Sequence, residues 1–233
     1  MNLYVLVNLG VIALPLLLSF DRRVAFFRRW PALLGALCVV SPVYIAWDVL
    51  VTARGDWWFN IEFAGDPVLF GLPLGEVLFF VTVPYACVFI YEVVRAYFPE
   101  YTARSMVRVL AATFSVVMIL IGLAAVFREQ QYTLLALLSA AAVLALVALL
   151  DRPMLTSSHT WLFLVLSYLP FLAVNGVLTS LPVVGYNPEA IWGVRAFSIP
   201  LEDFFYNFGM LAAYLLVFRS MKTILHRLAG GAV

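Results

Sequence analysis

Long apolar stretches, separated by short polar connections, run through nearly the whole chain. Each is close to the roughly 20 residues that a helix needs to cross the hydrocarbon core of a membrane. Near-continuous apolarity, rather than alternation at every second position, favours helices over the strands of an outer-membrane barrel. We therefore predict seven transmembrane helices, at Leu3 to Phe20, Ala32 to Val51, Val77 to Tyr97, Met106 to Phe127, Tyr132 to Leu150, Thr160 to Leu181 and Phe204 to Phe218.

Composition supports a polytopic membrane protein, because 65% of the 233 residues are hydrophobic and only 12% are charged. The first apolar stretch has no basic segment before it and ends in Asp21, Arg22 and Arg23, so we expect a retained helix rather than a cleaved signal peptide. A net charge of +1 gives no indication of a nucleic-acid partner, and we expect none.

The basic residues are distributed unevenly between the two sides that seven alternating helices would have. One side receives only Arg54, Arg128 and Arg195, and the positive-inside rule makes this the outer side. We therefore predict a multi-pass protein of the cell membrane with its N-terminus outside and its C-terminus in the cytoplasm. The cytoplasmic set would be Arg22, Arg23, Arg28, Arg29, Arg95, Arg104, Arg108, Arg152, Arg219, Lys222 and Arg227.

Residues that commonly bind metals or cofactors do not cluster. Cys38 and Cys87 lie within apolar stretches and are expected to pack as small hydrophobic side chains, while His159 and His226 lie far from both in sequence. The chain contains neither the GxGxxG signature after a strand nor GxxxxGK[ST]. We expect no metal and no cofactor.

Two acidic motifs, Pro73-Leu74-Gly75-Glu76 and Pro200-Leu201-Glu202-Asp203, each precede an apolar stretch and lie 127 residues apart. The same shift pairs Asn60 with Asn187, Glu62 with Glu189 and Asp48 with Asn175. It predicts two three-helix repeats, residues 1–105 and 129–233, joined by a connecting helix at 106–128. Because the repeats would share one orientation, the fold class is all-α integral membrane with a pseudo-twofold axis along the membrane normal.

The unusual polar residues fall at the predicted outer face. Acids that border a membrane span are costly to bury and are functional candidates by default. The alternative is that Glu76, Glu202 and Asp203 only stabilise the first turns of their helices.

Aromatic residues share helix faces with these acids, because residues three and four apart are neighbours on a helix. Glu76 lies near Phe79 and Phe80, Glu202 near Phe205 and Tyr206, and Asp48 follows Tyr44 by one turn. Aromatic faces stabilise positive charge. A carboxyl group in such a pocket near another carboxyl retains its proton more readily, so one acid can donate a proton and another can accept one. This arrangement suits redox-neutral isomerisation of an alkene through a cation.

Several motifs resemble those of the integral-membrane carotenoid cyclases, specifically the lycopene beta-cyclases built from two related membrane subunits or their fused form. The motifs are Tyr44 to Asp48 (YIAWD), Trp57 to Asn60 (WWFN), Gly71 to Phe80 (GLPLGEVLFF), Tyr85 to Glu92 and Arg195 to Asp203 (RAFSIPLED). The resemblance implies cyclisation of lycopene to gamma-carotene and then beta-carotene, without a cofactor. Its substrates would be lycopene and other carotenoids within the bilayer.

The chain departs from the family pattern at Gly75, where two adjacent acids are common. We therefore predict that Glu202, in the second motif, donates the proton, with Glu76 or Asp203 as its partner or base. Asp48, Asn60, Asn175 and Asn187 would orient these groups, and Arg195 would tune them. The predicted substrate-binding residues are Tyr44, Trp47, Asn60, Phe79, Phe80, Asn175, Asn187, Arg195, Phe205 and Tyr206.

Three other functions compete with this interpretation. A cyclase that forms epsilon rings or acts on C50 carotenoids is the closest. A proton-coupled transporter also fits parallel repeats and intramembrane acids, although its acids would be expected near the midplane. A retinal photoreceptor would need a lysine within the last span, and the only lysine, Lys222, lies beyond it.

Overall fold

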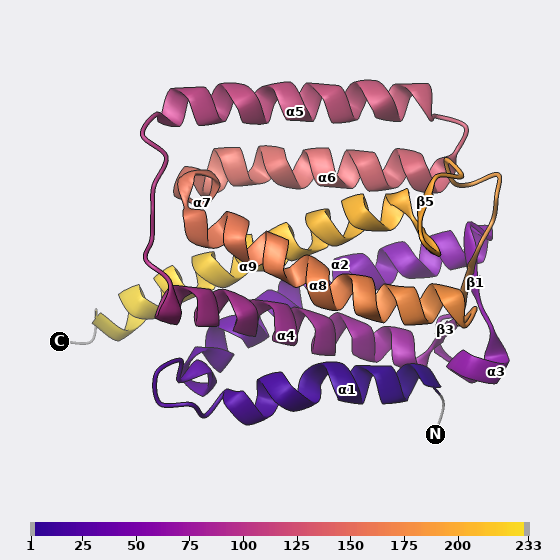
Figure 1. Ribbon diagram of the computed structural model, residues 1–233, viewed down its shortest axis with the longest axis horizontal. Helices are drawn as coiled ribbons and strands as arrows, with labels where there is room; N and C mark the ends of the chain where they lie inside the picture. Colours follow the sequence, from indigo (N-terminus) through magenta and orange to yellow (C-terminus); the bar gives the residue numbers. More distant parts are fainter. Residues whose placement is uncertain (1–2, 231–233) are drawn as a thin grey trace.

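The computed structural model describes residues 3–230, most of which form long helices lying side by side (Figure 1). Six helices are long and apolar enough to cross a membrane, which confirms the prediction of an all-α multi-pass membrane protein. The N-terminal helix α1 is apolar but has only 16 residues, so seven crossings remain a prediction. The long helices are α1 (Leu3–Leu18), α2 (Trp30–Arg54), α4 (Leu74–Tyr97), α5 (Met106–Val126), α6 (Gln131–Leu150), α8 (Ser158–Ser180) and α9 (Leu201–Gly230).

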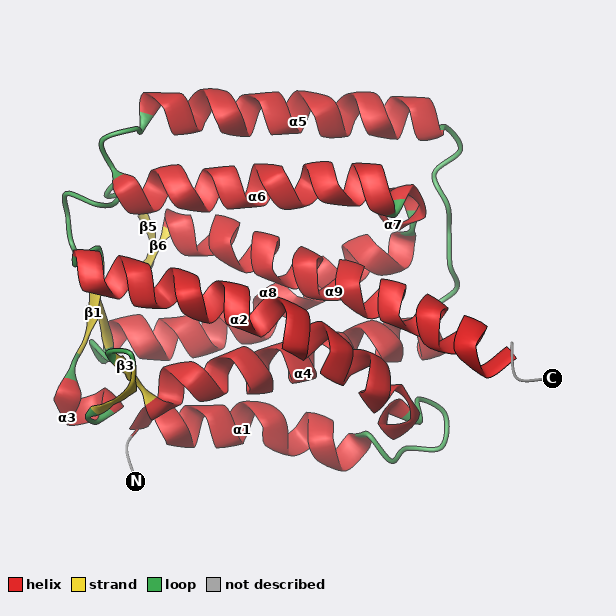
Figure 2. Cartoon of the chain, turned by 180° about the vertical axis from the view of Figure 1, so that it is seen from behind, coloured by secondary structure: helices red, strands yellow, loops and turns green. Residues whose placement is uncertain are grey.

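Shorter elements connect these helices, and all the strands lie at one end of the bundle (Figures 1 and 2). The apolar pattern did not predict them. They are η1 (Phe26–Arg29), α3 (Ile61–Ala64), α7 (Arg152–Thr156), β1 (Trp57–Phe59), β2 (Pro67–Leu69), β3 (Leu72–Pro73), β4 (Val184–Tyr186), β5 (Arg195–Ala196) and β6 (Ile199–Pro200). The outermost positions of the two predicted repeats, 1–2 and 231–233, lie outside the described residues.

Local chemistry accounts for several helix ends. Helix α2 begins with a proline in its first turn and stops before Gly55, whose φ of 80° suits a residue without a side chain. Helix α5 begins after Ser105, whose hydroxyl accepts a hydrogen bond from the Arg108 N–H. Prolines inside helices, such as Pro84 and Pro170, are tolerated in membrane helices because neighbouring groups satisfy the freed backbone carbonyls.

Helix α9 runs through the middle of the bundle and contacts α2, α4, α6 and α8 (Figure 1). Helix α4 similarly contacts α1, α2, α8 and α9. Helix α5 lies at the edge, against α6 and the short α7. The central helices therefore carry the buried core, in which Tyr91, Phe163 and Phe218 are among the completely enclosed aromatic side chains.

Three small antiparallel pairs of strands cover one end of the bundle. Strands β1 and β4 join segments that are far apart in sequence, with Trp57 opposite Tyr186 and Trp58 opposite Gly185. In the other two pairs, β2 with β3 and β5 with β6, a tight turn joins the two strands. These turns place Phe70 and Phe197, 127 residues apart, at positive φ angles of 46° and 57°.

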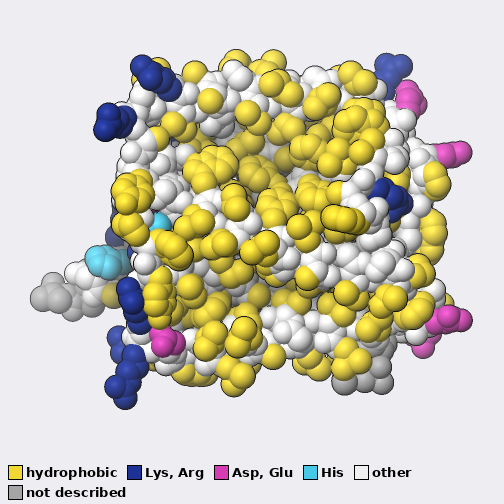
Figure 3. Space-filling view, in the orientation of Figure 1, with side chains coloured by type: hydrophobic (Ala, Val, Ile, Leu, Met, Phe, Trp, Pro, Cys, Tyr) yellow, Lys and Arg dark blue, Asp and Glu magenta, His cyan; other side chains and the backbone are white. Residues whose placement is uncertain are grey.

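Charged side chains gather at the two ends of the molecule, and the belt between them is apolar (Figure 3). On the face shown, Lys and Arg predominate at the end opposite the strands, and most Asp and Glu side chains lie at the strand end. An apolar belt bounded by charged ends is the surface expected of a protein embedded in a bilayer. The direction in which it crosses the membrane remains a prediction.

The β1–β4 pair predicts a specific steric sensitivity. A Cβ atom added to Gly185 would lie 2.4 Å from the Trp58 ring, so Gly185→Ala should lower the free energy of unfolding by about 1–3 kcal/mol through overpacking. Gly176→Ala in α8 is the matched control, because nothing lies within 4 Å of its added Cβ. Thermal unfolding in detergent measures both variants, and equal midpoints would contradict the observed β1–β4 packing.

Candidate active site

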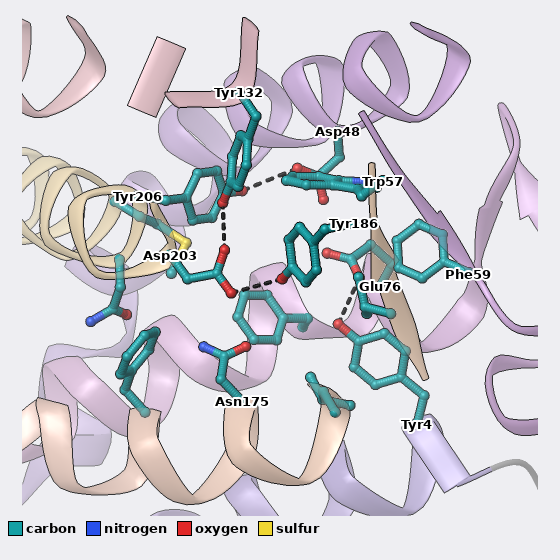
Figure 4. Close-up of a pocket in the computed structure, with 16 residues that line it drawn as sticks. Tyr4, Asp48, Trp57, Phe59, Glu76, Tyr132, Asn175, Tyr186, Asp203 and Tyr206 are labelled. Carbon is teal, nitrogen blue, oxygen red and sulfur yellow. Dashed lines mark hydrogen bonds between the residues drawn. The ribbon is translucent and has the colours of Figure 1, made fainter. Parts of the chain in front are cut away.

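A small cavity lies beneath the strands, where side chains from both halves of the sequence converge (Figure 4). Its volume is about 50 Å³, enough for a few water molecules. Acids and aromatic rings dominate its surface. The lining residues are Tyr4, Asp48, Trp57, Phe59, Glu76, Phe79, Tyr132, Phe171, Asn175, Leu178, Val184, Tyr186, Asp203, Tyr206, Asn207 and Met210.

Asp48 of α2 and Glu76 of α4 form a buried carboxyl pair at this cavity. Their side chains are in hydrogen-bond contact, and neither forms an ion pair with a basic side chain of residues 3–230. Two ionised carboxylates cannot hydrogen-bond each other and repel at this range, so one of the two must carry a proton.

Tyrosine hydroxyls hold this pair from two sides (Figure 4). Tyr4 of α1 donates a hydrogen bond of 2.6 Å to Glu76 Oε2. Tyr206 of α9 donates to Asp48 Oδ1 at 3.1 Å. Because Asp48 Oδ2 receives no other hydrogen bond from residues 3–230, a carboxyl proton shared with Glu76 would satisfy it.

Asp203, in the first turn of α9, has a different environment. Its two oxygens accept hydrogen bonds of 2.7 Å each, from the Tyr132 hydroxyl of α6 and the Tyr186 hydroxyl of β4 (Figure 4). Burial raises the pKa of Tyr186 well above its ordinary value, and the negative charge of Asp203 raises it further. The Tyr186 hydroxyl therefore stays protonated at neutral pH and remains a donor. Two such donors stabilise the ionised form of a carboxyl group, whereas its burial favours the protonated form.

Glu202 is buried but does not line the cavity. Its Oε1 accepts hydrogen bonds from the Thr133 hydroxyl and from the backbone N–H of Trp192, 2.6 Å away. The carboxyl group thereby links α9 to α6 and to the loop that precedes β5. These contacts anchor the loop around Trp192 to the first turn of α9.

The other predicted site residues divide into three groups. Asp48, Glu76, Phe79, Asn175, Asp203 and Tyr206 line the cavity. Tyr44, Trp47 and Phe80 lie behind it, with the Tyr44 ring centre 5.4 Å and the Trp47 ring centre 5.7 Å from that of Tyr206 and the Phe80 ring centre 6.4 Å from that of Tyr44.

The third group lies outside the cavity. Asn60 and Asn187 each accept a hydrogen bond of 3.0 Å from the backbone N–H two residues later, so they stabilise turns. Arg195 donates to the Ser198 carbonyl and lies 5.6 Å from the centre of the Tyr186 ring. Phe205 faces a separate groove between α5 and α8.

The sequence interpretation included Tyr206 but missed Tyr4, Tyr132 and Tyr186, the other tyrosines that donate to the acids. Tyr4 and Tyr132 lie 128 residues apart, one more than the shift of 127, so a constant shift did not align them. Allowing one inserted residue pairs them, and twelve of the sixteen lining residues then form six pairs. The pairs are Tyr4 with Tyr132, Asp48 with Asn175, Trp57 with Val184, Phe59 with Tyr186, Glu76 with Asp203, and Phe79 with Tyr206.

The Tyr4 ring accounts for Gly75 in the first acidic motif. A Cβ atom on Gly75 would lie 2.4 Å from Tyr4 Cγ, so any larger residue would displace this ring. The Asn8 side chain also donates a hydrogen bond of 2.9 Å to the Gly75 carbonyl. Close contact between α1 and α4 therefore requires glycine where the second motif has Glu202.

Comparison with known proteins identifies one family. A family model described as Lycopene cyclase matches residues 1–94 and 129–221, which together cover most of the chain. The two matched stretches begin 128 residues apart and end 127 residues apart, and α5 lies in the unmatched segment between them. No curated protein and no solved structure matches the chain.

A double-mutant cycle tests the contact between Gly75 and Tyr4. Gly75→Ala should destabilise the protein by about 1–3 kcal/mol in the wild-type background, because the added methyl group overlaps the ring. In a Tyr4→Ala background the same change should cost little, so the two effects should be strongly non-additive. Thermal unfolding in detergent provides the measurement. Gly122→Ala, with open space around it, should be additive with Tyr4→Ala, and additivity for Gly75→Ala would contradict the contact.

Proposed function

The chain belongs to the lycopene cyclase family, and we propose that it is a cofactor-independent lycopene beta-cyclase, an intramolecular lyase or isomerase that converts lycopene through gamma-carotene to beta-carotene. The observation that carries this proposal is that the Asp48–Glu76 carboxyl pair and a separate carboxyl group, Asp203, meet in one buried aromatic cavity. The family supports cyclisation of a carotenoid. The acids of the cavity supply the two proton transfers that a redox-neutral ring closure needs.

The Asp48–Glu76 pair is the proposed proton donor. Its carboxyl proton is transferred to the terminal double bond of the substrate, whose π electrons form the new C–H bond and leave a carbocation. A neighbouring double bond then attacks this cation and closes the six-membered ring through a new C–C bond. The hydrogen bonds from Tyr4 and Tyr206 stabilise the negative charge that the pair acquires.

Asp203 is the proposed base. It removes a proton from a ring carbon next to the cationic centre, and the C–H electrons become the ring double bond. One proton enters and one leaves, so no oxidant or reductant is consumed. This assignment moves the donor from Glu202, the residue predicted from sequence, to the Asp48–Glu76 pair, since Glu202 is bonded to Thr133 and Trp192 away from the cavity.

Aromatic rings around the cavity favour a cationic intermediate. The Trp57 ring centre lies 5.0 Å from that of Tyr132, 6.2 Å from that of Tyr186 and 6.3 Å from that of Tyr206. Their faces attract positive charge without acting as nucleophiles. The small, enclosed volume also limits the water available to capture the cation.

We also propose that residues 1–105 and 129–233 are two copies of one module, joined by the connecting helix α5 and related by a pseudo-twofold axis. Support comes from β1 and β4, in which Trp58 lies opposite Gly185, its partner under the 127-residue shift. The spacing of the two segments matched by the family model supports the same division. The distribution of basic residues favours a cytoplasmic C-terminus and an outward-facing site in the cell membrane.

Expression in a bacterium that accumulates lycopene tests the proposed reaction. We expect gamma-carotene to appear first and beta-carotene later, as separated by chromatography of the extracted pigments. Products with epsilon rings would support the cyclase assignment but show that the final proton is lost from a different carbon. Unchanged lycopene, with the protein confirmed in the membrane, would reject the cyclase assignment. Unchanged lycopene together with proton-dependent solute uptake would favour the transporter.

Single acid-to-amide variants separate the proposed roles. Glu76→Gln and Asp203→Asn should each lower conversion roughly 100-fold or more, because each removes one of the two proton transfers. Glu202→Gln should keep conversion within a few-fold of wild type, as should Glu129→Gln, an exposed control. Conversion is measured at equal amounts of membrane protein. Loss of activity in Glu202→Gln alone would return the donor role to Glu202.

A further inference from the structure

The acid cavity is much smaller than the substrate that the proposed function requires. At about 50 Å³ it has no room for the long hydrocarbon chain of a carotenoid, and only one end of such a molecule reacts at a time. The remainder of the substrate needs an apolar surface that adjoins the acids and opens to the bilayer. The following inference therefore rests on the proposed function.

A much larger groove lies on the side of the bundle between α5 and α8, with α6 and α9 forming its floor. Its volume is about 790 Å³, within the usual range of small-molecule sites. The lining is almost entirely apolar and includes Val116, Leu120, Leu144, Trp161, Phe205 and Phe208. Figure 3 shows this face as hollowed and covered by hydrophobic side chains. The groove exists because α5 contacts α6 but lies apart from α8.

The groove and the acid cavity approach each other at the start of α9. Asp203 lines the cavity, and the next residue, Phe204, lines the groove. Three rings stand between the two spaces: Phe171 faces the cavity, whereas Tyr168 and Phe204 face the groove. The Phe171 and Phe204 ring centres are 5.0 Å apart, and those of Tyr168 and Phe204 are 6.0 Å apart.

A hydrogen bond between α8 and α9 fixes the position of this three-ring cluster. The Tyr168 hydroxyl donates to the Phe204 carbonyl at 2.8 Å, which holds α8 against the first turn of α9. Aromatic side chains can change rotamer without breaking backbone hydrogen bonds, so a rotation of these rings would join the groove to the cavity. A second apolar pocket, lined by Phe79, Phe171 and Asn207, adjoins the cavity on the side of α1 and α4.

We propose that the groove between α5 and α8 binds the long polyene chain of the substrate, and that the cluster of Tyr168, Phe171 and Phe204 is the passage through which its end reaches the acids. A polyene fits this groove better than a lipid acyl chain does, because the end nearest the acids is lined by aromatic rings that stack on a conjugated chain. The groove opens directly to the bilayer, so an apolar substrate enters without crossing water.

Two adjacent alanines of α5 provide a matched test. Both side chains are exposed, but Ala112 lines the groove and Ala111 does not. In cells that accumulate lycopene, Ala112→Phe should reduce the yield of cyclised carotenoid about tenfold by filling the groove, while Ala111→Phe should match wild type. Equal yields from the two variants, or equal losses in both, would overturn the proposal.

A second readout does not depend on cyclisation. The Asp203→Asn protein is purified from the same cells, and the lycopene retained per protein is measured by absorbance after extraction. Adding Ala112→Phe should lower this retention several-fold, and adding Ala111→Phe should not. If the wild-type protein retains lycopene in the groove but forms no ring, the proposed function is rejected, whereas the proposed binding site is supported. Active protein whose retention is insensitive to Ala112→Phe would show that lipid occupies the groove.

Discussion

Burial of three carboxyl groups at the edge of a membrane protein, none of them in an ion pair with a basic side chain of residues 3–230, is the constraint on which the site depends. Among residues 3–230, tyrosine hydroxyls donate to Asp48, Glu76 and Asp203, and Asp48 also interacts with Glu76. A buried acceptor that loses its donor costs about 1–3 kcal/mol, and more when it is charged. Helix α1, helix α6 and strand β4 must therefore each place a tyrosine at the same cavity, which explains why short segments far apart in sequence converge there.

Small differences between the halves give the equivalent acids unequal chemistry. In the first half, Asp48 supplies a second carboxyl beside Glu76, so a proton must be held there. In the second half, Asn175 takes the position equivalent to Asp48, and Tyr186 provides a hydroxyl where the first half has Phe59. In the proposed mechanism, these exchanges make the first half the proton donor and the second half the base. A symmetrical pair of sites would supply two donors or two bases, whereas a proton-initiated ring closure needs one of each.

Six of the seven long helices could be predicted from sequence to within three residues, since long apolar segments leave few alternatives; Met106 to Phe127 against α5, Met106–Val126, is an example. The end predicted for the last helix, Phe218, was wrong, because α9 continues beyond the apolar segment to Gly230. The acidic motifs also contributed Glu76 and Asp203 to the lining of the cavity. Tyr206 was predicted, but Tyr4 and Tyr132 were missed because they lie within apolar segments and are one residue out of the main shift. The prediction that the Glu202 side chain faces the site was wrong for a geometric reason. Neighbouring helical residues point about 100° apart, so Glu202 and Asp203 cannot both face one cavity.

The separation of a small acid cavity from a large apolar groove determines how a long substrate can be processed. With the chain in the groove between α5 and α8, only the end beside Phe204 reaches Asp203 and the Asp48–Glu76 pair. The other end lies on the lipid side and cannot meet the acids in the same binding event. Closing a second ring then requires the substrate to leave, turn around and bind again. Under this proposed binding mode, a molecule with one ring would be a released intermediate, and its abundance would depend on how tightly the groove holds a chain whose first end has already closed.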